Sequence, residues 1–123
     1  MKRLIILFLG MTSLCMFEAH AHTHLAAATP ADEAVTSTPP EEIVLEFNAD
    51  VRLLAVTLED ASAQTIALDP VSEALQNRFT LAILAELSPG DYLVTWRAVG
   101  ADTHVVSGKL HFSVAAQDAV ASR

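Results

Sequence analysis

The sequence has very little sulfur, and all of it lies near the N-terminus. Its single cysteine is Cys15, and its methionines are Met1, Met11 and Met16. A chain that has lost residues 1–21 therefore forms no disulfide, and cysteine usage says nothing about its redox compartment. Such a chain also lacks the thiolate and thioether ligands that soft metal ions prefer, which leaves imidazole, carboxylate and amine groups.

Basic residues are scarce as well. The chain has 7 Lys and Arg against 15 Asp and Glu, for a net charge of −8. Without residues 1–21 the counts are 5 and 14, which gives −9. This balance argues against nucleic acid and anionic lipid surfaces as partners. With only four glycines, the chain also has no Gly-rich phosphate-binding loop.

The one long apolar run is too short to span a membrane. Leu4 to Phe17 is 14 residues, whereas a membrane span needs about 20. Lys2 and Arg3 precede this run, and Ala19 and Ala21 form an A-x-A site after it. This pattern predicts a secretory signal peptide over residues 1–21, cleaved after Ala21. The mature protein would then begin at His22, outside the cytoplasm and without stable membrane insertion.

Three alternatives to this cleavage are weaker. An uncleaved membrane anchor requires a longer apolar run. Cleavage after Ala19 would place the bulky Phe17 where a small residue is preferred. A lipid-modified Cys15 is disfavoured because the preceding Leu14 is large.

The remaining 102 residues have the size of one domain and a β pattern. Residues 31–42 indicate a loop, 69–77 a helical turn, and 116–123 a flexible C-terminal tail. Alternating apolar residues and turn residues predict strands at 42–47, 51–59, 65–68, 78–83, 92–99 and 107–114. The predicted fold is all-β, an immunoglobulin-like antiparallel β-sandwich of six or seven strands.

Aromatic residues in the later strands favour structural roles. Tyr92 follows the Pro89-Gly90 turn and is placed to form a tyrosine corner. Trp96 is expected in the core, since large rings fill sandwich interiors. His111 alternates with apolar neighbours and is expected on the solvent face of the last strand.

The remaining histidines are candidate metal ligands. As a terminal residue, His22 would offer its free amine and its imidazole together. Asp102 and His104 are two residues apart in a polar loop, a spacing that places both side chains on one side of an extended segment. Taken alone, the pair is better explained by an Asx-turn beside a solvated histidine. If the N-terminal strand lies near this loop, however, all three residues can converge on one ion.

Several segments together resemble the CopC-type periplasmic copper-binding proteins. The similarity includes a histidine start at His22 with a proline eight residues later, the segment 46–51, and the segment 87–99. Its most specific part is Trp-Arg-x-Val-x-x-Asp-x-His over residues 96–104, followed by Ser107-Gly108. The resemblance covers nearly all of the predicted mature chain, as a CopC-like domain over residues 22–115.

The resemblance implies a seven-stranded Greek-key β-sandwich or barrel and a Cu(II) site made by His22, Asp102 and His104. Nitrogen ligands with one carboxylate suit Cu(II). The chain would be a periplasmic monomer that sequesters or carries copper for resistance or homeostasis, with an inner-membrane CopD-type copper transporter as a partner. The methionine-rich Cu(I) site of some relatives should be absent. Val105 stands where many relatives have proline.

Three questions stay open at this point. His24 is either an auxiliary ligand, a strand residue on the opposite face, or a competing Cu(II) ligand through backbone amides of an unfolded terminus. The sequence shows no nucleophile–base pair, which favours a protein that is not an enzyme. The alternatives are a copper-dependent oxidase or oxygenase with a terminal-histidine site, and a metal-free immunoglobulin-like interaction module.

Overall fold

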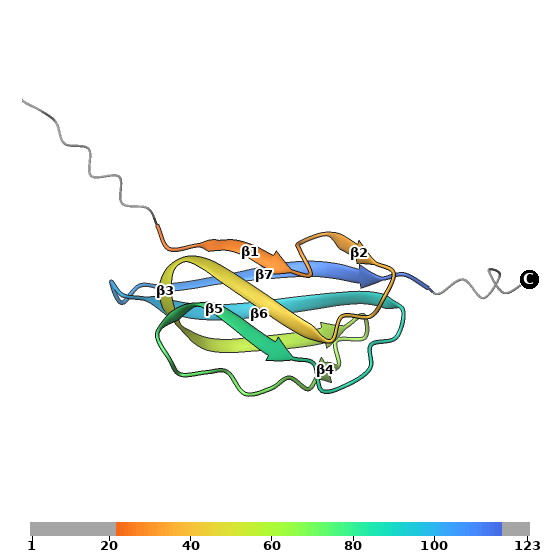
Figure 1. Ribbon diagram of the computed structural model, residues 1–123. Helices are drawn as coiled ribbons and strands as arrows, with labels where there is room; N and C mark the ends of the chain where they lie inside the picture. Colours follow the sequence, from red (N-terminus) through yellow and green to blue (C-terminus); the bar gives the residue numbers. More distant parts are fainter. Residues whose placement is uncertain (1–21, 117–123) are drawn as a thin grey trace, which may run out of the picture.

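Strands make up all the regular structure of residues 22–116, which are the residues that the computed structural model describes (Figure 1). The seven strands are β1 (Leu25–Thr29), β2 (Ala34–Thr36), β3 (Glu42–Asp60), β4 (Thr65–Ile66), β5 (Gln76–Ala82), β6 (Gly90–Gly100) and β7 (Val105–Val114). Within these residues no helix is long and apolar enough to cross a membrane. The predicted signal peptide (1–21) and residues 117–123 of the predicted tail lie outside the described residues.

Strand β3 organises the fold because it pairs with different partners along its 19 residues. Its first part, up to Phe47, pairs with β1 along one edge, and almost the same residues pair with β5 along the other edge. From Val51 onward it pairs with β6, and near its end with β4. The residues between, 48–50, are exposed and interrupt the register with β5. The two strands predicted at 42–47 and 51–59 are therefore one bent strand.

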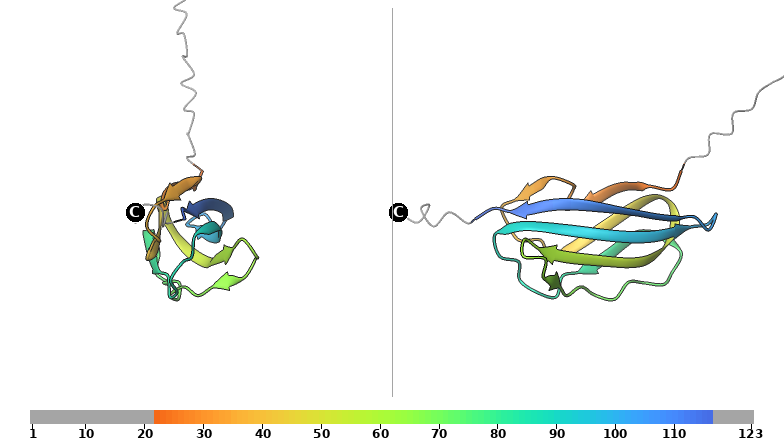
Figure 2. Two further views of the ribbon diagram at one scale, coloured as in Figure 1. Left: turned by 90° about the vertical axis from the view of Figure 1, so that its right-hand side faces the viewer. Right: turned by 180° about the vertical axis from the view of Figure 1, so that it is seen from behind.

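The sheet curls over itself because β3 belongs to both of its halves. The strand order is β1-β3-β6-β7-β2, with β4 and β5 attached to β3 (Figure 2). This arrangement confirms the predicted all-β, Greek-key sandwich or barrel of about seven strands. One pairing departs from the antiparallel prediction, since β2 runs parallel to β7 over Phe112–Val114.

The core lies between the two halves of the curled sheet. Its aromatic centre includes Phe47, which meets Phe79 and Trp96 edge to face at centroid distances of 6.1 and 5.1 Å. Every second residue of β6 from Tyr92 to Ala98 is buried, as the alternation predicted. The other buried apolar side chains come mainly from β3, β5 and β7: Ile43, Leu45, Val51, Leu53, Leu58, Leu81, Leu110, Phe112 and Val114.

Both predicted roles of aromatic residues are confirmed. The Tyr92 hydroxyl donates a 2.5 Å hydrogen bond to the Ser88 carbonyl, which is the tyrosine corner. Trp96 is 5% exposed, and its ring lies against Gly108 of β7. A Cβ atom at Gly108 would be 2.6 Å from the Trp96 ring, so this glycine is needed for close strand–ring packing.

Two further sequence predictions are wrong. In place of the helical turn expected at 69–77, residues 69–75 are irregular and β5 begins at Gln76. The Asp69 amide donates to the Ala82 carbonyl, and Pro70 keeps the preceding residue extended. The loop expected at 31–42 contains β2, which reaches the free edge of β7. Each error has the same cause, a pairing partner far away in the sequence.

Candidate metal centre

The loop between β6 and β7 carries two of the predicted ligands. It is closed by the Gly100 amide, which donates to the His104 carbonyl at 3.1 Å, and by the Thr103 amide, which donates to the Gly100 carbonyl. Thr103 has a φ of 69°, so the chain reverses within four residues. This tight turn places Asp102 and His104 side by side at the tip of the hairpin.

Asp102 and His104 are in direct contact. Nδ1 of His104 lies 2.9 Å from Oδ2 of Asp102, and the His104 amide donates to Oδ1 at 3.2 Å. The pKa of Asp102 is lowered mainly by the hydrogen bond from the His104 side chain, and the bond from the His104 amide lowers it further. The two side chains are 61% and 85% exposed. Asp102 is therefore an accessible, ionised carboxylate at neutral pH.

This contact has the spacing of two ligands on one metal ion. Ligands about 2.0 Å from a metal at a right angle to each other are roughly 2.8 Å apart, and the observed separation is 2.9 Å. A metal ion can thus replace the proton between Nδ1 and Oδ2. With a metal at Nε2 instead, Asp102 would orient the ring from the outer shell.

The N-terminal segment before β1 is held by Asn48, which lies in the bend of β3. The Asn48 side chain accepts from the His24 amide at 2.8 Å and donates to the His22 carbonyl at 3.0 Å. Its backbone amide also donates to the His24 carbonyl at 3.1 Å. Asn48 therefore fixes both residues that flank Thr23.

This segment meets the β6–β7 loop at Gly100. A Cβ atom placed there would lie 2.9 Å from Oδ1 of Asp102 and 3.0 Å from Oγ1 of Thr23. Figure 1 and the right-hand view of Figure 2 show the start of β1 and the β6–β7 turn at the same end of the molecule. The condition on which the sequence argument depended, an N-terminal segment close to the loop, is met.

The His22 ring is not part of the Asp102–His104 pair in this structure. Among residues 22–116, three ligand side chains with atoms within 4.8 Å of one another occur only at Asp32, Glu33 and His111. His22 here follows Ala21 in the unprocessed chain, so its nitrogen is an amide and not an amine. The three-residue site stays a prediction for the processed protein.

His24 has a different environment from the other two histidines. Its Nδ1 lies 2.8 Å from the His22 carbonyl, and because a carbonyl only accepts, Nδ1 carries the proton. The ring therefore folds back along its own segment and leaves Nε2 as its acceptor.

Comparison with known proteins assigns the chain to a family. A CopC domain model matches residues 25–115. The chain belongs to the CopC family. It is 30% identical to protein YobA of Escherichia coli K12 over 107 residues, which cover 84% of this chain and 86% of YobA. It is 31% identical to copper resistance protein C of Escherichia coli over 116 residues, covering 85% and 90% of the two chains.

The fold of this CopC-family chain agrees with a solved structure. The crystal structure of CopC from Methylosinus trichosporium OB3b aligns with a TM-score of 0.67 at 24% identity, covering 79% of this chain and 97% of that one. This likeness concerns the fold. The resemblance recognised in the sequence is therefore confirmed at the level of family and architecture.

Sequence reasoning missed the residues that bring the N-terminal segment of this CopC-family chain to the loop. Asn48 stands at the end of an alternating strand, and nothing in its local pattern indicates hydrogen bonds to the residues on either side of Thr23. Gly100 resembles an ordinary turn residue. Their roles depend on pairings across 24 or more residues, which periodicity alone does not specify.

Proposed function

We propose that the processed chain, beginning at His22, is a periplasmic Cu(II)-binding protein that sequesters or carries copper. Its ligands are the terminal amine and imidazole of His22, the Asp102 carboxylate and the His104 imidazole. Three nitrogens and one oxygen make a tetragonal set, which suits Cu(II). The chain acts in copper resistance or homeostasis, as the name of its relative copper resistance protein C says of that protein.

One observation carries this proposal, the Asp102–His104 pair beside the N-terminal segment. Two ligands are already spaced for one ion, at 2.9 Å. The same loop touches Thr23, the residue that follows the proposed terminal ligand. Cleavage after Ala21 would free the His22 amine within one residue of this contact.

Exposure of the site favours a carrier over a permanent store. A metal held by two side chains that are 61% and 85% exposed can be passed on by ligand exchange. We propose an inner-membrane CopD-type transporter as the recipient, and a monomeric carrier. Mixing copper-loaded protein with that transporter in vesicles should lower the copper content of the protein, whereas transfer equal to that of protein-free vesicles would reject this partner.

Calorimetric titration with Cu(II) tests the metal centre. A chain that begins at His22 should bind its first equivalent more tightly than micromolar. Asp102→Ala with His104→Ala should weaken this binding at least about 100-fold, because losing even one outer-shell partner costs 10- to 100-fold. The matched control begins at Ala21, so that the same imidazole is present without the terminal amine of His22.

Three results would contradict the proposal. The first is that the first equivalent of Cu(II) binds more weakly than micromolar. The second is that the two loop substitutions leave the affinity unchanged. The third is that the chains starting at His22 and at Ala21 have the same affinity and the same paramagnetic resonance spectrum. The last result alone would exclude the His22 amine as a ligand but would not contradict the roles of Asp102 and His104.

We propose further that the chain is not an enzyme. In an oxygen-activating copper site a coordination position must be open, and here Asp102 would fill it. Oxygen consumption with ascorbate, copper and a polysaccharide should therefore match that of free copper. Robust turnover that disappears on His104→Ala would overturn the carrier and establish an oxidase or oxygenase.

A further inference from the structure

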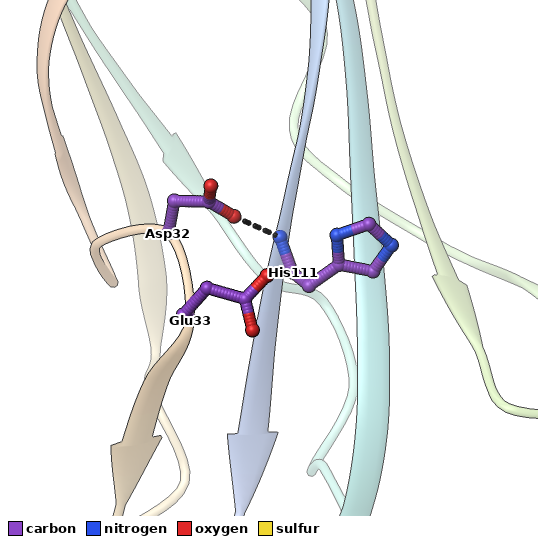
Figure 3. Close-up of side chains that lie close together, drawn as sticks. All are labelled: Asp32, Glu33 and His111. Carbon is purple, nitrogen blue, oxygen red and sulfur yellow. Dashed lines mark hydrogen bonds between the residues drawn. The ribbon is translucent and has the colours of Figure 1, made fainter.

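A second group of metal-ligating side chains lies far from the β6–β7 loop. Asp32 and Glu33 belong to the turn before β2, and His111 lies on the exposed face of β7 (Figure 3). One ligand atom from each lies within 4.8 Å of the other two. All three residues are exposed, and His111 is almost 80 residues away from the other two in the sequence.

Backbone contacts hold this group together. Oδ1 of Asp32 accepts from the His111 amide at 2.8 Å, which leaves Oδ2 available. The Glu33 amide donates to the His111 carbonyl at 2.6 Å. The turn is thus bound to β7 at the histidine itself, and the ligand atoms are brought together without help from an ion.

The surroundings are suited to a cation. Glu33, Asp91 and His111 line a hollow of about 400 Å³ beside β7, so the Asp91 carboxylate faces the same hollow as Glu33 and His111. Asp91 is oriented by the Ser113 hydroxyl, which donates to it at 2.6 Å. Lys109 lies two residues before His111 and offsets part of this negative charge.

The ligand chemistry selects the ion. Two carboxylates with one imidazole suit borderline divalent ions such as Zn(II) and Cu(II), whereas Mg²⁺ prefers oxygen ligands alone. Cu(I) is disfavoured because no cysteine or methionine follows Met16. An exposed three-ligand group leaves further positions for water, so binding should be weaker than at a four-ligand site.

We propose that Asp32, Glu33 and His111 form a second metal site, which binds Zn(II) or Cu(II). His111 comes seven positions after His104, so the two centres lie roughly 23 Å apart at about 3.3 Å per residue. At this distance the two sites should bind independently. The second site does not rest on the copper-carrier proposal.

Zinc titration of a chain that lacks the first centre tests this site. The chain begins at Ala21 and carries His22→Ala, Asp102→Ala and His104→Ala, so that none of the proposed copper ligands remains. Added ZnCl₂ should shift the His111 imidazole resonances in the NMR spectrum and saturate at one equivalent. Asp32→Asn with Glu33→Gln should weaken binding at least about tenfold, since direct ligands matter at least as much as outer-shell partners. Glu73→Gln, an exposed carboxylate elsewhere, is the matched control.

Glu33→Gly separates loss of a ligand from loss of the fold. Glu33 has a φ of 65°, a conformation that glycine adopts without steric cost. The variant should therefore keep its Tm and still bind zinc at least about tenfold more weakly. Repeating the titration with Cu(II) shows which ion is preferred. The site is rejected if the His111 resonances do not move, or if they move equally in the Asp32→Asn/Glu33→Gln variant.

Discussion

A single amide side chain positions the residue from which most of the proposed affinity would come. Asn48 uses its oxygen, its side-chain nitrogen and its backbone amide on the two residues around Thr23. It is not one of the proposed ligands. Its effect on copper would act through the position of His22, in the manner of an outer-shell residue.

Asn48→Ala should weaken Cu(II) binding by about 10- to 100-fold. The substitution removes two hydrogen bonds and lets the N-terminal segment move away from Gly100. Calorimetry on the chain beginning at His22 measures the affinity, and paramagnetic resonance reports whether the ligand set changes. Asn48→Asp keeps the hydrogen bond from the His24 amide and should therefore lose less Cu(II) affinity than Asn48→Ala.

A control variant and a chain with a different first residue show whether Asn48 positions His22 or only stabilises the fold. Ala49→Ser changes the neighbouring exposed residue and should leave affinity unchanged. In a chain beginning at Ala21, where the His22 amine is absent, Asn48→Ala should have little further effect. An equal loss in both chains would show that Asn48 acts on the fold and not on His22.

At the scale of elements, the hairpin of β6 and β7 connects the core to the metal loop. The tyrosine corner fixes the start of β6, Trp96 packs against Gly108 halfway along, and the loop ends the hairpin. Tyr92 is buried, and burial raises the pKa of its hydroxyl, with the nearby Asp60 charge adding to the effect. The entry to the hairpin is therefore sensitive to alkali.

Tyr92→Phe should cost about 1 kcal/mol of unfolding free energy at neutral pH, because the hydrogen bond to Ser88 is lost. The sign of the pH effect follows from linkage. A raised pKa in the folded state means that the unfolded chain loses its proton first, so stability falls as pH rises above about 10. The phenylalanine variant should lack this part of the decline.

Denaturant unfolding of both proteins between neutral and alkaline pH measures this difference. Because the chain has one tyrosine, its phenolate absorbance titrates Tyr92 alone. A wild-type pKa at or below its ordinary value of about 10 would contradict the burial argument. So would an equal alkaline loss of stability in both proteins.

The success of sequence reasoning varied with the range of the contacts. Buried alternation from Tyr92 to Ala98 and the tyrosine corner were predictable, because both are local patterns. Strand β2 was missed because it depends on pairing with β7, and the helical turn was wrongly expected because Asp69 bonds to Ala82 of β5 and not within its own segment. In the candidate site, Asp102 and His104 could be found two residues apart, whereas Asn48 could not be found from its neighbours.

At the scale of the whole molecule, the two proposed centres lie at different places along a negatively charged barrel. The first lies where the N-terminal segment meets the β6–β7 turn, and the second lies near the end of β7. The net charge of −8 attracts cations to both without selecting among them. Selectivity must therefore come from ligand sets, and only the first would include an amine.

Copper binding should stabilise the whole fold, since the proposed centre links the N-terminal segment to the hairpin. Free Cu(II) at 100 times its dissociation constant adds about 2.7 kcal/mol, which corresponds to a rise in Tm of roughly 10–20 °C for a domain of this size. Scanning calorimetry on the chain beginning at His22 measures the rise. Asp102→Ala with His104→Ala should abolish most of it.

Acid should remove this stabilisation before it affects Asp102. Protons compete with copper for the imidazoles and the amine, so the affinity for copper falls as the pH falls. Asp102 has a lowered pKa in the folded protein, so its own contribution to stability is present above its ordinary pKa and is lost only as pH falls through the lowered value. Copper should thus leave while the carboxylate is still ionised, because protons displace it from the nitrogen ligands. A Tm rise that persists at a pH near 4, or that disappears only as the carboxylate titrates, would show that the nitrogen ligands do not hold the metal.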